Sequence, residues 1–304
     1  MPTFFIAPTT HATTPGHDTT GTGTSLLPWL TLTKANASSV AGDTVILKNG
    51  TYTWSSIGHM TSIRLYRSET VNGAILDGAD GNFGMLAGIF PWDGVGSVSA
   101  IGIVFQNVRR TAASGVSVFS CASGALGILS FQNCTFRRLA AAGTDAFAAN
   151  RGGIFWGEGA ALNVTFDNCL FDDCFSHTGT TGQLFAPLAG TAPCVFSLTN
   201  CTFSFRAAAP ENLRNVFFVV NSNAAYLTVN LKNNIFSADN GTTVGFFSHL
   251  AKASIVASHN LYDDMTNVSS GAGDITGNPI FENPAGANFN LRPTSPAPNK
   301  GTLI

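Results

Sequence analysis

The sequence predicts an all-β chain that coils as a parallel β-helix, a solenoid of about seven to eight rungs with three short strands in each. Three observations predict it: an eight-residue motif recurs, apolar residues alternate within it, and a large ring ends most copies. The copies are Ile103–Arg110, Leu129–Phe136, Val164–Phe171, Phe196–Phe203, Val229–Phe236 and Ile255–Tyr262. They recur every 26 to 35 residues, a period typical of solenoids.

Each motif is centred on a polar residue, an Asn in all but the last copy. Apolar residues lie two and four positions before it, which indicates a strand with one buried face. The same parity predicts that the Asn points inward, where its amide must be hydrogen-bonded. Stacking the amides on neighbouring rungs would satisfy them. The predicted ladder comprises Asn107, Asn133, Asn168, Asn200 and Asn233, with His259 at this position in the last copy.

A large ring follows the central residue by three positions, and reaching the same interior after three steps requires a bend. Asn tolerates the left-handed backbone that such a bend needs. The predicted aromatic stack comprises Phe136, Phe171, Phe203, Phe236 and Tyr262. Cys134, Cys169 and Cys201 directly follow the Asn, and we expect them to form a stack of small buried side chains.

The chain is expected to form a single domain with three parts: an N-terminal strand and cap helix (1–43), the coil (44–277) and an irregular C-terminal cap (278–304). A short helix is expected within Leu26–Val40. Third strands are expected at Gly115–Phe119, Gly153–Trp156, Leu184–Pro187, Val216–Val220 and Val244–Phe247. The connections of variable length follow the ring position and so emerge on one side of the coil, the side that often binds ligands in repeat proteins.

Composition excludes some functions. The 304 residues carry a net charge of −2, and only 11% are charged, so the electrostatic signature of nucleic-acid binding is absent. No run of about 18 apolar residues predicts a membrane span. The first residues, Met1–Pro8, lack the basic and apolar regions of a secretory signal peptide. No cofactor is expected.

Both ends of the chain resemble pectate-lyase-like right-handed parallel β-helix proteins. The residues that carry the resemblance are Phe4–Pro8, Pro28–Leu32, Ala41–Val45 and Gly50–Tyr52 at the start, and Gly277–Phe281, Asn288–Leu291 and Ser295–Gly301 at the end. The resemblance implies a right-handed coil with caps at both ends. It implies no single function, because this fold hosts lyases, hydrolases, adhesins and viral spikes.

The chemistry of such lyases needs acids on neighbouring rungs to hold Ca²⁺, and a base. Asp172-Asp173 and Asp263-Asp264 share one repeat position, but three rungs separate them, about 14 Å at the strand spacing. We interpret them as solvated turn acids and expect no metal. The resemblance to polygalacturonases fails because no acid pair has a Gly-His-Gly partner. In the enzyme alternative Asp172, Asp173 and His177 would be catalytic, and Ca²⁺ a cofactor.

Arginines form a second group that bears on function. Pairs lie on neighbouring rungs, and a single Arg ends the longest loop: Arg109, Arg110, Arg137, Arg138 and Arg151. Guanidinium groups in a cluster could bind an anionic sugar or a partner's carboxylates. The simpler interpretation is solubilising charge on a charge-poor surface.

The sequence leaves three functions open. The first is a non-catalytic structural or adhesive protein of a bacteriophage virion, such as a head decoration, tail spike or fibre. It would dock onto other virion proteins, onto itself or onto a surface polysaccharide. The alternative is an extracellular polysaccharide lyase or glycoside hydrolase acting on acidic polysaccharide. The third is a glycan-binding module without turnover.

Overall fold

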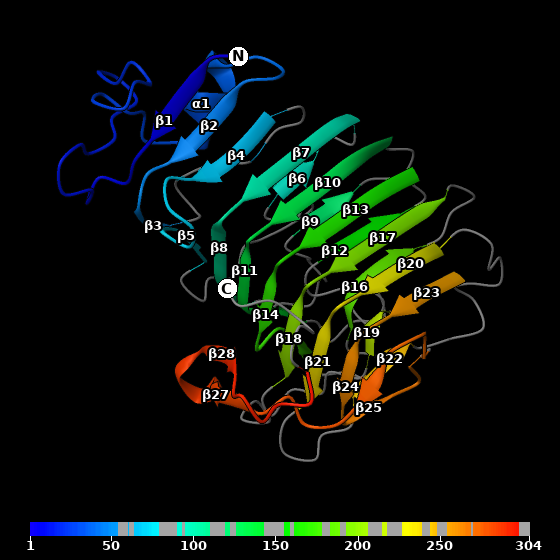
Figure 1. Ribbon diagram of the computed structural model, residues 1–304. Helices are drawn as coiled ribbons and strands as arrows, with labels where there is room; N and C mark the ends of the chain where they lie inside the picture. The colour runs from blue at the N-terminus through cyan, green and yellow to red at the C-terminus, as the bar shows by residue number, and fades with distance from the viewer. Residues whose placement is uncertain are drawn as a thin grey trace.

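The computed structural model shows one coil of strands stacked along a single axis (Figure 1). It describes residues 1–53, 60, 64–78, 90–92, 95–109, 119–121, 126–142, 155–158, 161–177, 183–188, 193–205, 215–217, 227–238, 244–247, 254–268 and 270–297. The chain is a right-handed parallel β-helix, as the sequence predicts. No helix among these residues is long and apolar enough to cross a membrane.

Three parallel sheets form the walls of the coil. The first sheet consists of β1 (Thr3–Ile6), β2 (Thr44–Leu47), β4 (Arg64–Ser68), β7 (Val95–Ile101), β10 (Leu126–Gln132), β13 (Ala161–Asp167), β17 (Cys194–Thr199), β20 (Leu227–Lys232) and β23 (Ser254–Ser258). The second consists of β3 (Gly50–Thr53), β5 (Ala74–Asp77), β8 (Ile103–Arg109), β11 (Thr135–Ala142), β14 (Leu170–Asp172), β18 (Thr202–Phe205), β21 (Ile235–Ala238), β24 (Leu261–Asp263) and β26 (Ile275–Thr276), with β15 (Phe175–His177) paired to β11. The third consists of β6 (Phe90–Trp92), β9 (Phe119–Cys121), β12 (Phe155–Glu158), β16 (Gln183–Leu188), β19 (Asn215–Phe217), β22 (Val244–Phe247) and β25 (Met265–Thr266).

The expected three strands per rung are therefore present, and every strand pair within these sheets is in parallel register. Two of the expected third strands lie wholly in the described residues and are present: Leu184–Pro187 lies within β16, and Val244–Phe247 is β22. The other three, Gly115–Phe119, Gly153–Trp156 and Val216–Val220, lie partly outside the described residues.

Stacked rings fill the coil. Phe105, Phe136, Phe171, Phe203, Phe236 and Tyr262 lie face to face on successive rungs, with ring centroids 4.2 to 5.5 Å apart. A second column, Phe131 and Phe166, stacks beside it at 5.0 Å. The five Phe residues of the main column are 2% exposed or less, and burying each such ring contributes about 2 to 3 kcal/mol. One continuous aromatic core thus runs along the axis.

The central Asn residues form the bend between the first and second sheets. Their φ angles lie between 53° and 56°, and that of His259 is 57°, which is the left-handed conformation. Asn168 Nδ2 donates to Asn133 Oδ1 at 2.5 Å and Asn233 Nδ2 to Asn200 Oδ1 at 3.2 Å. The ladder is interrupted elsewhere, because Asn200 donates to Asp167 and Asn107 donates to Asp77.

The expected inward orientation of these Asn side chains is wrong. The described ladder residues are half-buried, and the residue after each one takes the interior position: Cys134, Cys169, Cys201, Asn234 and Asn260, all 0% exposed. Each donates to a main-chain carbonyl of the preceding rung, as Cys169 does to Phe131 and Asn234 to Leu198. A left-handed residue shifts the strand parity by one, so the next side chain turns inward.

The segments at the two ends of the chain pack on different parts of the coil. Helix α1 (Leu32–Ser38) begins at its N-cap Thr31, later than the sequence suggested, and buries Leu32 and Ala35. At the other end, β27 (Phe281–Asn283), a 3₁₀ turn η4 (Pro284–Gly286) and β28 (Asn288–Leu291) form an antiparallel hairpin. In Figure 1 this red hairpin lies against the second sheet and not across the end of the coil.

Candidate functional site

The site lies on the outer face of the second sheet, where two columns of side chains point away from the core. They flank the stacked rings, because side chains alternate along each strand. The inner-edge column, nearest the bend, runs Ile75, Val104, Thr135, Leu170, Thr202, Ile235, Leu261. The polar column, two residues further along each strand, runs Asp77, Gln106, Arg137, Asp172, Ser204, Ser237, Asp263.

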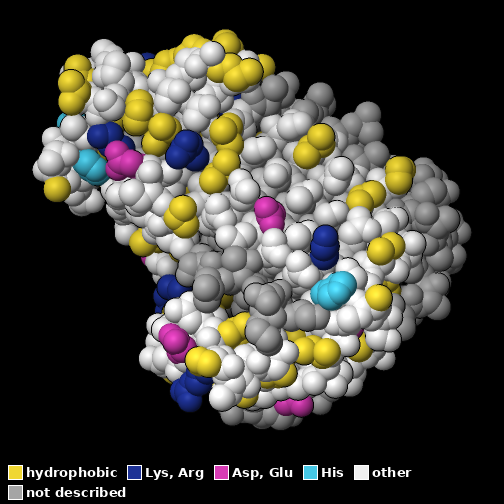
Figure 2. Space-filling model, viewed as in Figure 1, with side chains coloured by type: hydrophobic (Ala, Val, Ile, Leu, Met, Phe, Trp, Pro, Cys, Tyr) yellow, Lys and Arg dark blue, Asp and Glu magenta, His cyan; other side chains and the backbone are white. Residues whose placement is uncertain are grey.

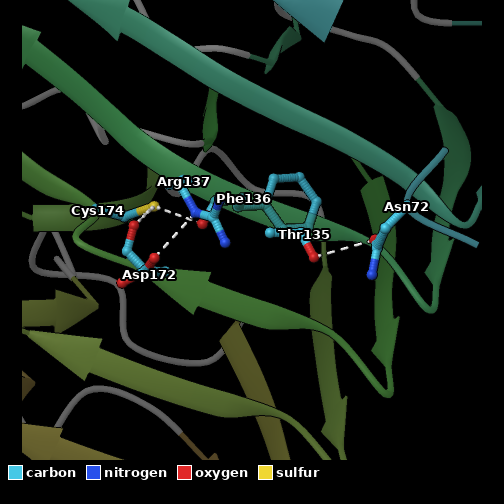
Figure 3. Close-up of polar contacts among 6 residues, drawn as sticks. All are labelled: Asn72, Thr135, Phe136, Arg137, Asp172 and Cys174. Carbon is cyan, nitrogen blue, oxygen red and sulfur yellow. Dashed lines mark hydrogen bonds and ion pairs between the residues drawn. The ribbon is translucent and has the colours of Figure 1, made fainter. Parts of the chain in front are cut away.

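The polar column is held together by hydrogen bonds between neighbouring rungs. Gln106 Nε2 donates to Asp77 at 2.8 Å, and Ser237 Oγ donates to Asp263 at 2.8 Å. Between them, Arg137 Nε donates to Asp172 Oδ2 at 3.0 Å, the ion pair shown in Figure 3. Ser204 is 1% exposed, and its Oγ has no hydrogen-bond partner among the described residues.

Arg137 and Asp172 differ sharply in exposure. The side chain of Asp172 is 0% exposed, whereas that of Arg137 is 31% exposed. A buried carboxylate requires a charged partner, and the guanidinium supplies it through Nε alone. Its two Nη groups make no hydrogen bond to the described part of the chain. Asp172 therefore fixes Arg137 in place and leaves its outer donors available to a ligand.

A pocket of about 370 Å³ lies between this face and the C-terminal hairpin. The sheet contributes Ile75, Val104, Gln106, Thr135, Arg137, Leu170 and Thr202, the turn before β5 contributes Asn72, and the hairpin contributes Ala287, Asn288, Phe289 and Asn290. Thr135 Oγ1 donates to Asn72 Oδ1 at 3.2 Å and fixes that wall (Figure 3). In Figure 2 the outline of the molecule is notched between the N-terminal cap and the hairpin. The lining combines amides, hydroxyls, aliphatic side chains, one ring and one cation.

The acids singled out by the sequence fall in different environments. Asp172 is not a solvated turn acid, as the sequence suggested, because it is buried against Arg137. Asp173 is half-buried at a left-handed bend with φ 55°. Asp263 and Asp264 lie three rungs away from this pair, as expected. The backbone of His177 lies in β15, but its side chain is outside the described part of the structure.

The arginines of the predicted cluster also lie in different environments. Arg137 lines the pocket, and the neighbouring Arg138 is exposed at a left-handed bend with φ 49°. Arg109 ends β8, with its side chain outside the described part of the structure. Arg110 and Arg151 lie outside the described residues altogether. The expected arginine cluster is thus represented at the pocket by Arg137.

A calcium site does not fit the residues that are described. Ca²⁺ requires several carboxylate or carbonyl oxygens around one point. No three His, Cys, Asp or Glu side chains gather in the described ranges, and Asp172 is already paired with a cation. Calcium, like the catalytic roles of Asp173 and His177, stays a prediction.

Sequence reasoning missed most of the lining. Gln106, Thr135 and Thr202 lie beside the ring position, and a reading of both outward columns could have found them. Asn72 and Asn288–Asn290 come from a turn and a hairpin without periodicity, so no repeat signal points to them.

The buried thiols provide no reactive group at this site. Cys174 donates to the carbonyl of Phe136 at 3.2 Å (Figure 3), and burial raises the pKa of its thiol well above the ordinary value. Burial also raises the pKa of Cys169. A nucleophilic cysteine needs a lowered pKa and access to solvent, so these thiols belong to the core.

No protein-family model matches the sequence, and no curated protein matches it. Among solved structures, the chain is similar to a PL6-family alginate lyase, with 14% identity, a TM-score of 0.49 and a match over 91% of this chain. It is similar to a pectin methylesterase from carrot, with 13% identity, a TM-score of 0.45, and 100% of this chain and 88% of that chain covered. It is also similar to the pectate lyase Pel9A, with 14% identity, a TM-score of 0.33, and 99% of this chain and 92% of that chain covered.

The chain spans 39% of the length of the alginate lyase. The three parallel sheets described above agree with the β-helix fold that the resemblance to pectate-lyase-like proteins implied.

Proposed function

We propose that the chain is a carbohydrate-active β-helix that recognises an acidic polysaccharide in the pocket between the second sheet and the C-terminal hairpin. The observation that carries this proposal is Arg137, a partly exposed guanidinium anchored by a fully buried carboxylate at the wall of a pocket whose other lining residues are uncharged, both polar and apolar. Nothing in the described residues or the comparisons points to a virion, so this proposal replaces the virion function expected first. Docking onto virion proteins or self-association stays a prediction.

The chemistry of the lining matches a sugar acid. Sugar hydroxyls both donate and accept hydrogen bonds, as the amides of Asn72, Gln106 and Asn290 do. The ring of Phe289 offers an apolar surface for the carbon faces of a sugar ring. A guanidinium matches the two oxygens of a carboxylate. A uronic acid presents all three features together.

Binding of matched oligosaccharides tests this proposal. We expect calorimetry to detect binding of a hexasaccharide of uronic acids, and weaker binding of the same hexasaccharide after its carboxyl groups are reduced to alcohols. Arg137→Gln combined with Asp172→Asn removes both charges without leaving a buried carboxylate unpaired. It should lower the affinity for the acidic ligand about tenfold or more, since a charged hydrogen bond contributes about 1.5 to 3 kcal/mol.

The matched control is Lys232→Gln, which removes an exposed cation from the outer face of the first sheet. Its affinity should equal that of the unaltered protein. Equal binding of the acidic and reduced hexasaccharides, or equal losses in both variants, would contradict the proposal.

Cleavage of the bound polysaccharide, by lyase or hydrolase chemistry, is the second candidate. The observation that favours it is Asp173, a half-buried acid one residue beyond the fixed Asp172 and two residues before β15. Incubation with acidic polysaccharide, with and without Ca²⁺, should release unsaturated or reducing ends. That activity should disappear in Asp173→Ala. Binding without release of new ends would leave a glycan-binding protein without turnover.

A further inference from the structure

The C-terminal hairpin closes one end of the outer face of the second sheet, where the pocket lies. Phe281 and Ala297, which are 8% and 0% exposed, pack with Ile235 and Leu261 of the inner-edge column. The partly buried residues Ile275, Phe289 and Leu291 complete this cluster. The inner-edge column on β21 and β24, together with Ile275 of β26, is thus covered by protein, and a ligand lying along this column cannot extend over these rungs.

The open part of the face is short. The pocket spans the rungs of β5, β8, β11, β14 and β18, which are four spacings or about 19 Å at the usual strand separation. The side nearest the bend is also walled, because Thr135 donates to Asn72 across the rung of β8. The pocket is therefore closed toward the C-terminal rungs and toward the bend.

Hydrogen bonds within the C-terminal hairpin hold this wall of the pocket in place. Arg292 N donates to Ile280 O at 3.0 Å and Arg292 Nη2 to Glu282 O at 3.0 Å. Asn288 Nδ2 donates to Glu282 Oε2 at 3.0 Å. With the ring of Phe289 against that of Phe281 at 5.3 Å, these contacts fix the hairpin as a firm boundary.

We infer that the site receives the end of a saccharide chain or a short oligosaccharide, and not the interior of a polymer. A saccharide chain that entered the pocket would meet β28 once it had passed β18, and it could extend no further. Residues Ala287–Asn290 would then contact its terminal sugar. This inference rests on the proposed function, and it specifies how that site selects among acidic saccharides.

A length series on the unaltered protein tests the inference. Uronic acid oligosaccharides from three to ten residues long are titrated by calorimetry, with concentrations counted per chain. Binding of the end predicts an affinity that stops changing once the pocket is filled, because each chain has one such end. Binding of the interior predicts an affinity that keeps rising with length, because longer chains offer more registers.

Modified ends provide the second measurement. A bulky fluorophore attached at the reducing end, or in a separate sample at the non-reducing end, should abolish binding in one sample and leave it unchanged in the other. Affinity that rises with length, or indifference to both labels, would overturn the inference while leaving the proposed function intact. No binding at any length would refute the proposed function itself.

Discussion

The outer faces of the first and second sheets are built from the same alternating pattern, but their outward side chains differ in how deeply they are buried. On the first sheet a central outward column reads Ser99, Ser130, Thr165, Ser197, Asn230, Val256, and most of its members are half-buried. Figure 2 shows mainly uncharged surface over these strands. On the second sheet every member of the inner-edge column except Ile75 is buried, and the polar column includes an ion pair.

The difference in burial comes from the segments that lie over the second sheet, and not from the side-chain pattern of the strands. Thr135 and Thr202 are 3% and 2% exposed, whereas Thr165, on the uncovered face, is half-exposed. Both faces alternate in the same way around one core. A covered face can exclude water from charged groups and bind a ligand between two walls, so we place the site on the second sheet.

The largest expected effect concerns the cover. Phe281→Ala should weaken the packing of the hairpin on the second sheet by about 3 kcal/mol, because a buried ring is replaced by a cavity. Amide hydrogen exchange in β27 and β28 should accelerate. Val256→Ala removes an apolar side chain that is 60% exposed on the first sheet, and exchange should not change. Equal effects of the two substitutions would remove the contrast between the faces.

The sequence predicts those parts of the structure that repeat on every rung, and it does not predict the contacts that occur once. The alternating apolar residues and the ring three positions after Asn133 or Asn168 were sufficient to predict the coil, because they repeat on every rung. Burial of Cys134 was expected, but the inward orientation assigned to Asn133 was wrong and the inward turn of Asn234 was missed, because a left-handed residue changes the parity. The hairpin contacts were missed because they do not repeat.

The next effect concerns the acids of the two faces. Asp172→Asn should lower the free energy of unfolding by about 1 to 2 kcal/mol, since a fully buried carboxylate loses its ion pair with Arg137. The partial exposure of Arg137 keeps the cost below that of a fully buried pair. Asp167→Asn on the first sheet, at a half-buried acid, should cost less than about 0.5 kcal/mol. Urea unfolding measures both, and a larger loss in Asp167→Asn would contradict the assigned burial.

Alkaline pH should destabilise the side of the coil beneath the second sheet. Burial raises the pKa of Cys174 above its ordinary value near 9, so the folded state keeps a neutral thiol while the unfolded chain ionises. This contribution to stability is complete below pH 9 and is lost as pH rises toward the raised folded pKa. The slope is up to about 1.4 kcal/mol per pH unit for each such thiol. Unfolding at several pH values should show a shallower decline in Cys174→Ala, and identical slopes would contradict this.

The smallest effect is expected on the uncovered face. Ser130→Ala replaces a half-buried hydroxyl of the first sheet and should change the free energy of unfolding by less than about 0.5 kcal/mol. Thr135→Val, the matched change on the second sheet, removes the hydrogen bond to Asn72 and should cost about 1 kcal/mol. Thermal melts of the two variants compare the faces, and a greater loss in Ser130→Ala would reverse the assignment.

The central claim is that ligand binds on the covered face, and amide chemical shifts test it most directly. The labelled protein is titrated with a short uronic acid oligosaccharide. We predict shifts for Gln106, Thr135, Arg137 and Asn290 around the pocket, and none for Ser130, Thr165 and Asn230 on the first sheet. Shifts confined to the first sheet, or no shifts at saturating concentrations of oligosaccharide, would contradict the account.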